Sequence, residues 1–149
     1  MKSKIFKNIK SFCTLIFFLA IGVLHSQDKA KTMVQLEITG IKNSAGFIQV
    51  AVYNSDTEFD KEVFIKVIAV PASSEVHVSI PNLDIGKYAI AVYHDENKNQ
   101  KLDKNFVGIP KEGYGFSNNA VGKLGPPKFS ETSFSLDTQL KKLSIRMNY

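Results

Sequence analysis

The 149-residue chain has a single cysteine, Cys13, so it cannot form an intrachain disulfide. It has neither a Gly-x-Ser-x-Gly nucleophile motif nor a phosphate-binding Walker loop, which argues against an α/β-hydrolase and a P-loop nucleotidase. Charged residues make up only 22% of the chain and hydrophobic residues 44%. This balance is typical of a globular protein and excludes a disordered or collagen-like one.

The first 26 residues have the pattern of a secretory signal peptide. Residues 1–10 contain four lysines and no acid, and residues 12–24 are then almost wholly apolar. This apolar run is shorter than the roughly 20 residues that a membrane-spanning helix needs, and Cys13 lies at the wrong end of it for a lipid anchor. We predict cleavage after Ser26, with an uncleaved anchor as the alternative. The protein is therefore expected in the periplasm or outside the cell, with no stable membrane anchor.

Removal of residues 1–26 changes the charge of the chain. The whole sequence has 19 Lys+Arg against 14 Asp+Glu, a formal net charge of +5. The predicted signal peptide contains four of these lysines and no acid. Its removal leaves 15 basic residues against 14 acidic ones, a net charge of +1. The only cysteine also leaves, which excludes thiol catalysis and zinc–thiolate sites. A nearly neutral chain provides no electrostatic basis for binding nucleic acid.

Residues 27–149 predict one all-β domain. Apolar and polar residues alternate in most of its short runs, which is the period of a half-buried strand. About seven such strands, and no amphipathic helix of three turns, favour a Greek-key β-sandwich. Residues 42–46 predict a hairpin turn, residues 64–70 a buried strand and residues 87–93 a central strand. The expected strands are 34–38, 47–53, 64–70, 76–80, 87–93, 134–136 and 143–149.

One long segment, residues 104–130, contains no convincing strand. It is rich in glycine and proline, and it holds Tyr114 and Phe116. A loop of this length inside a compact domain is usually functional. Two interpretations remain open: the aromatic side chains pin the segment to the edge of the sandwich, or the segment faces a ligand.

The sharpest motif follows the expected central strand, at residues 95–103. Its oxygen-bearing side chains stand at positions 1, 3, 5 and 9 of an EF-hand-type calcium loop, and position 7 offers a backbone carbonyl. This spacing suits calcium, because alternate residues of a tightly wound loop point inward and the ion takes about six to eight oxygens. The alternative is an Asx-rich turn whose side chains cap their own backbone. The predicted ligands are Asp95, Asn97, Asn99, Lys101 and Asp103.

Two positions depart from the calcium-loop pattern. Gln100 stands at position 6, where the turn prefers glycine, and a left-handed glutamine costs roughly 1 kcal/mol. Phe106 stands at position 12, where a bidentate glutamate is usual, so Glu112 is considered as a further ligand. Because the loop has few carboxylates, we expect a Kd for calcium on the order of 10⁻⁴–10⁻³ M.

Catalytic groups are sparse outside this loop. His77 is expected to be a solvated residue on the polar face of a strand, and His94 a hydrogen-bonded residue at a strand end. Glu112 with Asp103 or Glu131 could form the carboxylate pair of a hydrolase acting on cell-envelope carbohydrate. Nothing in the spacing favours such a pair. We therefore predict a protein that is not an enzyme and keep the hydrolase as the alternative.

Two neighbouring strings resemble a known family. His-Asp-x-Asn-x-Asn-x-x-x-Asp at residues 94–103 is followed by Gly-Ile-Pro-Lys-Glu-Gly-Tyr-Gly-Phe-Ser at residues 108–117. This combination resembles the bacterial secreted family called domain of unknown function 2141, over about residues 33–149. The resemblance implies an exported all-β domain of the prealbumin-like or carboxypeptidase-regulatory-like type and no enzymology. The family string usually has Gly where this chain has Gln100.

These observations together predict an exported module that acts in binding or structure. Its acidic loop is expected to hold calcium, and its long loop to form a recognition surface. The expected partner is an envelope protein or a glycan.

Overall fold

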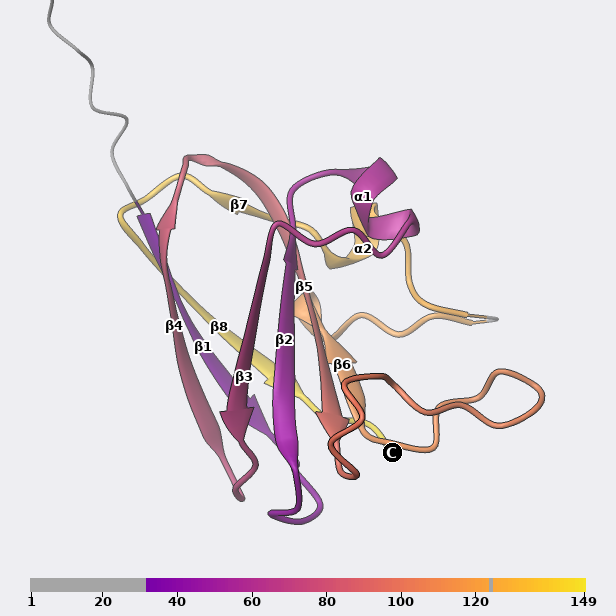
Figure 1. The fold of residues 1–149 in the computed structure, drawn as a ribbon. Coiled ribbons are helices and arrows are strands. Elements are labelled where there is room, and N and C mark those ends of the chain that lie inside the picture. Colours follow the sequence, from indigo (N-terminus) through magenta and orange to yellow (C-terminus); the bar gives the residue numbers. More distant parts are fainter. Residues whose placement is uncertain (1–31, 124) are drawn as a thin grey trace, which may run out of the picture.

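The computed structural model describes residues 32–123 and 125–149, so the predicted signal peptide lies outside the described residues. Two β-sheets pack face to face, and two short helices lie beside the larger sheet (Figure 1). None of the helices in the described part of the chain is long and apolar enough to cross a membrane. The predicted all-β class is confirmed.

The smaller sheet has three strands in the order β4-β1-β8. β1 (Thr32–Thr39) lies in the middle, antiparallel to β4 (Val76–Leu83) and parallel to β8 (Leu140–Arg146). Every second residue of β1 is buried, as the period of a strand with one face on the core predicts. The first and last strands of the domain therefore lie side by side.

The larger sheet has five strands. β2 (Phe47–Tyr53) lies between β3 (Lys66–Pro71) and β5 (Gly86–Asp95). The other edge of β5 pairs with both β6 (Tyr114–Phe116) and β7 (Phe134–Leu136), so β5 is central, as predicted. The described residues thus form eight strands, one more than the approximate count expected. The Greek-key connectivity and the prealbumin-like class stay predictions.

The hydrophobic core lies between the two sheets. Alternate residues of β1, β4 and β8 meet those of β2 and β5, and burial of this apolar area is the main stabilising term. The fully buried aliphatic residues of the core include Val34, Leu36, Ile38, Ile48, Val50, Val52, Ile80, Ile90, Leu136 and Ile145.

A second, aromatic cluster covers the outer face of the larger sheet. It joins α1 (Asp56–Asp60) to α2 (Phe129–Thr132) through the rings of Phe59 and Phe129, whose centroids lie 5.9 Å apart at 62°. Phe116 of β6 packs edge-on against Phe59 at 6.2 Å. Contacts of this geometry contribute about 0.5–1.5 kcal/mol each beyond area burial. Phe116 thus holds part of the long segment to the sheet.

The prediction of a hairpin at residues 42–46 is wrong. A hairpin requires its two strands to pair, but β1 pairs only with strands of the smaller sheet and β2 only with strands of the larger one. Both strands bury an apolar face, and these faces meet across the core. The turn therefore carries the chain from one sheet to the other.

The prediction of a buried strand at residues 64–70 is also wrong. β3 pairs only with β2, so it is an edge strand, and its residues alternate between half-buried and exposed. Phe64 is 51% exposed and Val67 is 44% exposed. A continuous apolar run indicated burial on both faces, but one face of this run remains open to solvent.

Residues 104–130 contain the short strand β6, which sequence periodicity did not reveal. Three residues are too few for an alternating pattern to be detected. β6 ends in η1 (Ser117–Asn119), where the Oγ of Ser117 accepts the N–H of Ile90 at 2.9 Å and donates to the carbonyl of Thr132 at 2.6 Å. Asn118 follows with a left-handed φ of 62°. This buried serine links β5, β6 and α2.

Candidate metal centre

The predicted calcium loop begins where β5 ends. Asp95 is the last residue of β5 and is fully buried. Its Oδ1 accepts the N–H of Asn99 at 2.9 Å, and its Oδ2 accepts the N–H of Gln100 at 3.0 Å. A buried carboxylate is stable only when such donors satisfy it. The loop backbone is therefore wound around the Asp95 side chain.

The loop also brings together the other oxygen-bearing side chains. The Nδ2 atoms of Asn97 and Asn99 lie 2.6 and 3.1 Å from the two carboxylate oxygens of Asp103. The backbone N–H of Lys101 donates to Oδ1 of Asn99 at 2.8 Å. All five predicted ligand positions thus belong to one hydrogen-bonded loop.

The two asparagine amides decide how well the oxygen atoms of the loop suit a calcium ion. Both amides direct N–H groups at Asp103, so they donate hydrogen bonds to both oxygens of its carboxylate. A half-turn about χ2 exchanges amide nitrogen and oxygen with little change in shape. It gives up the backbone hydrogen bond that each amide oxygen accepts, worth about 1 kcal/mol. The structure thus shows the hydrogen bonds of an Asx-rich turn, and the amide oxygens would be available to calcium only after both amides rotate.

Two residues of the loop have left-handed backbone. The φ of Lys98 is 65° and that of Gln100 is 62°. Gln100 stands at position 6, where a tightly wound calcium loop favours glycine for this same conformation. The loop adopts it at a cost of roughly 1 kcal/mol for glutamine. Its hydrogen bonds to Asp95 offset that strain.

Glu112 joins the two ends of the loop. It is only 6% exposed, and its Oε1 and Oε2 accept the backbone N–H groups of Glu96 and Asp103, each at 3.0 Å. The sequence indicated Glu112 as an extra ligand or a catalytic carboxylate. The structure instead shows both of its oxygens bound to backbone, so Glu112 positions the loop. The sequence did not show this contact, because it forms only when the hairpin before β6 brings Glu112 back beside the loop.

The other carboxylate considered for a hydrolase pair, Glu131, lies far from this loop. Glu131 belongs to α2, which sits toward the opposite end of the larger sheet (Figure 1). Its Oε2 accepts the N–H of Lys128 at 2.7 Å, which caps the start of α2. The structure therefore does not bring Glu131 together with Glu112 or Asp103.

His94 is a buried, hydrogen-bonded residue at the end of β5, as predicted. Its Nε2 lies 2.7 Å from the carbonyl oxygen of Ala45, and its Nδ1 lies 2.7 Å from the hydroxyl of Tyr149. Because a carbonyl only accepts, Nε2 donates, and in the neutral ring Nδ1 accepts from Tyr149. The tyrosine oxygen also accepts the N–H of Lys42 at 3.0 Å. The C-terminal tyrosine is thus a structural residue that sequence reasoning missed.

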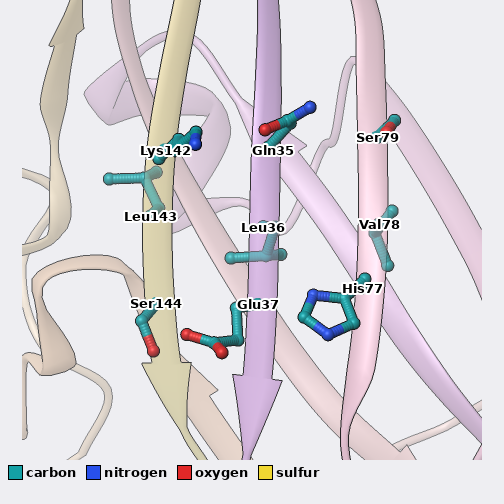
Figure 2. Close-up of a pocket in the computed structure, with 9 residues that line it drawn as sticks. All are labelled: Gln35, Leu36, Glu37, His77, Val78, Ser79, Lys142, Leu143 and Ser144. Carbon is teal, nitrogen blue, oxygen red and sulfur yellow. The ribbon is translucent and has the colours of Figure 1, made fainter.

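A separate group of titratable residues lies on the outer face of the smaller sheet. Figure 2 shows His77 and Glu37 on neighbouring strands, at a shallow cavity of about 610 Å³. Nε2 of His77 lies 2.7 Å from Oε1 of Glu75, and the ligand atoms of His77, Glu75 and Glu37 all lie within 4.8 Å of one another. The His77 side chain is 69% exposed, in agreement with the solvated residue predicted. We assign this group as a largely exposed cluster of polar side chains, with His77 within hydrogen-bond distance of Glu75.

Most of the chain matches one protein-family model. The family is described as "Uncharacterized protein conserved in bacteria (DUF2141)", and the match covers residues 36–144. No curated protein and no solved structure matches the chain. The family match includes the acidic loop and strands of both sheets, so the chain belongs to this bacterial family.

Proposed function

We propose that this DUF2141 protein is an exported β-sandwich module that acts in binding or structure and that binds calcium weakly at residues 95–103. The observation that carries the proposal is the winding of the loop around buried Asp95, with left-handed Gln100 at the sixth position. The basic and apolar pattern of residues 1–26 supports export.

A weak site would be sufficient outside the cytoplasm. Extracellular calcium modules have Kd values on the order of 10⁻⁴–10⁻³ M. With a Kd of about 0.1 mM and about 2 mM calcium, binding would stabilise the folded state by roughly 1.8 kcal/mol. Calcium would then hold the loop in one conformation beside the long segment, residues 104–130. We propose this segment as the recognition surface for an envelope protein or a glycan.

We further propose that the protein is not an enzyme. Glu112 is a buried carboxylate beside the loop, and both its oxygens accept backbone hydrogen bonds. A general acid or base needs an oxygen within reach of a substrate proton, and Glu112 is only 6% exposed. This arrangement supports a structural role for Glu112 rather than a catalytic one.

Thermal unfolding with and without calcium tests the metal site. The chain from residue 27 onward, first treated with chelator, is melted in calcium up to about 10 mM, which is about ten Kd for the weakest affinity expected. We expect calcium to raise the midpoint, and the variant Asp103→Asn to abolish most of the rise. Asp137→Asn changes an exposed aspartate between β7 and β8, and should respond like the unmodified chain. If calcium does not change the thermal midpoint of the unmodified chain, the loop is an Asx-rich turn without a calcium site.

A further inference from the structure

A small hairpin at residues 103–111 carries apolar side chains into solvent directly after the acidic loop. Phe106 is 100% exposed, Val107 is 61% exposed and Ile109 is 59% exposed. In Figure 1 this segment, in orange, extends away from the body of the sandwich. Isolated exposed apolar residues are ordinary, but three within four positions at one loop tip form a patch that is unfavourable in water.

Hydrogen bonds order the hairpin that presents this patch. Lys104 and Pro110 form an antiparallel bridge, and the N–H of Asn105 donates to the carbonyl of Ile109 at 2.8 Å. The Oδ1 of Asn105 accepts the N–H groups of Val107 and Ile109 at 3.1 and 2.9 Å. The backbone of the turn is thus satisfied locally. Its apolar side chains are exposed because the turn directs them outward.

Exposed lysines lie close to this apolar tip in the sequence. Residues 95–112 contain four lysines, all exposed, and four acids, of which Asp95 and Glu112 are buried and Glu96 and Asp103 are half-buried. The carboxylate of Asp103 is already bonded to the amides of Asn97 and Asn99. Within the described residues, no acidic side chain forms an ion pair with these lysines. The loop and hairpin at residues 95–112 therefore have no net charge, but their fully exposed charged side chains are lysines.

We propose that the tip formed by Phe106, Val107 and Ile109 inserts into the surface of a bilayer containing anionic phospholipid. Apolar side chains that project from a convex loop find a suitable environment at the acyl boundary of a bilayer. Lysines set back from them lie at the level of the phosphate groups, where the negative surface potential attracts them. The contact is peripheral and reversible, unlike an anchor, and it does not require calcium.

Vesicle sedimentation tests the proposal. The chain from residue 27 onward, which holds every strand and helix of the described fold, is mixed with phosphatidylcholine vesicles with or without phosphatidylglycerol, in EDTA. We expect binding to the anionic vesicles, weakened by added salt. Phe106→Ser should lower the partition coefficient about tenfold, and Lys104→Glu at least about fivefold. Circular dichroism checks that each variant is folded.

Two matched variants serve as controls. Phe64→Ser removes an aromatic side chain that is 51% exposed near α1, and Lys142→Glu reverses an exposed charge on the smaller sheet. Both should bind vesicles like the unmodified chain. Absence of binding to anionic vesicles, or equal losses in test and control variants, would overturn the proposal. Because EDTA is present throughout, the outcome is independent of calcium binding.

Discussion

The hydroxyl of Tyr149, at the C-terminus, lies 2.7 Å from the Nδ1 of buried His94, which directly precedes the candidate calcium loop. The other ring nitrogen of His94 lies 2.7 Å from the carbonyl of Ala45. One imidazole thus connects the end of β5, the turn between the sheets and the C-terminus. This network supports the base from which the loop at residues 95–103 emerges.

Removal of the Tyr149 hydroxyl should destabilise the protein. Tyr149→Phe leaves Nδ1 of His94 and the N–H of Lys42 without their partner, so we expect a loss of about 1–2 kcal/mol in the free energy of unfolding. Urea denaturation followed by circular dichroism measures this loss. Tyr114→Phe is the control and should change stability by less than about 0.5 kcal/mol. Equal effects of the two variants would contradict a structural role for the His94–Tyr149 bond.

A side chain at residue 113 should displace Tyr149. A Cβ on Gly113 would lie closer to Cζ of the Tyr149 ring than atoms can pack. We expect Gly113→Ala to lower the free energy of unfolding by about 1–3 kcal/mol. A Cβ on Gly86 would meet its nearest neighbour at 3.5 Å, an ordinary contact. Gly86→Ala is therefore the control, and a similar loss there would refute the steric argument.

Neutralisation of Glu112 should weaken the fold. Glu112→Gln presents an amide N–H to one of the two backbone N–H groups that the carboxylate now binds. We expect a loss of about 1–3 kcal/mol in the free energy of unfolding, measured by chemical denaturation. Glu62→Gln changes an exposed glutamate and serves as the control. An unaltered stability for Glu112→Gln, together with loss of a hydrolytic activity, would instead support the hydrolase alternative.

Glycine at position 100 should stabilise the loop. Gln100 has a φ of 62°, a conformation that glycine adopts without steric strain. Gln100→Gly should raise the free energy of unfolding by up to about 1 kcal/mol, reduced by the entropy of the freer unfolded chain. It should also tighten calcium binding in a titration followed by calorimetry. Gln100→Ala retains the strain and should show neither gain.

Stability should decline at alkaline pH. Burial raises the pKa of Tyr53 above the ordinary value of 10.0, and the charge of Glu62 raises it further; burial and Asp95 do the same for Tyr93. The unfolded chain therefore loses these protons first as pH increases, so the contribution of the two tyrosines to stability is constant below about pH 10 and falls above it.

Urea midpoints measured from about pH 8 to about pH 11 test this dependence. The variant Tyr53→Phe removes one buried hydroxyl that titrates. Its midpoint should fall less steeply with pH than that of the unmodified chain. If the urea midpoints of the two proteins fall with the same slope as pH rises, Tyr53 does not contribute to the loss of stability at alkaline pH.

Strand alternation and ligand spacing were readable from the sequence because both are local. The side chains of a strand repeat every two residues, so β1, β2, β4 and β5 could be placed before their partners were known. The loop at residues 95–103 is equally local, since the hydrogen bonds among its own residues join positions at most six apart. The run at residues 64–70 misled because apolar composition alone does not distinguish an edge strand from a buried one.

The sequence alone determined the all-β class and the position of the acidic loop. Only the tertiary structure decided that β1 pairs in parallel with β8 rather than with β2, and that Glu112 and Tyr149 support the loop. These contacts join residues from 9 to 107 positions apart. No periodicity encodes such pairs, because they form only when packing of the two apolar sheet faces brings distant segments together.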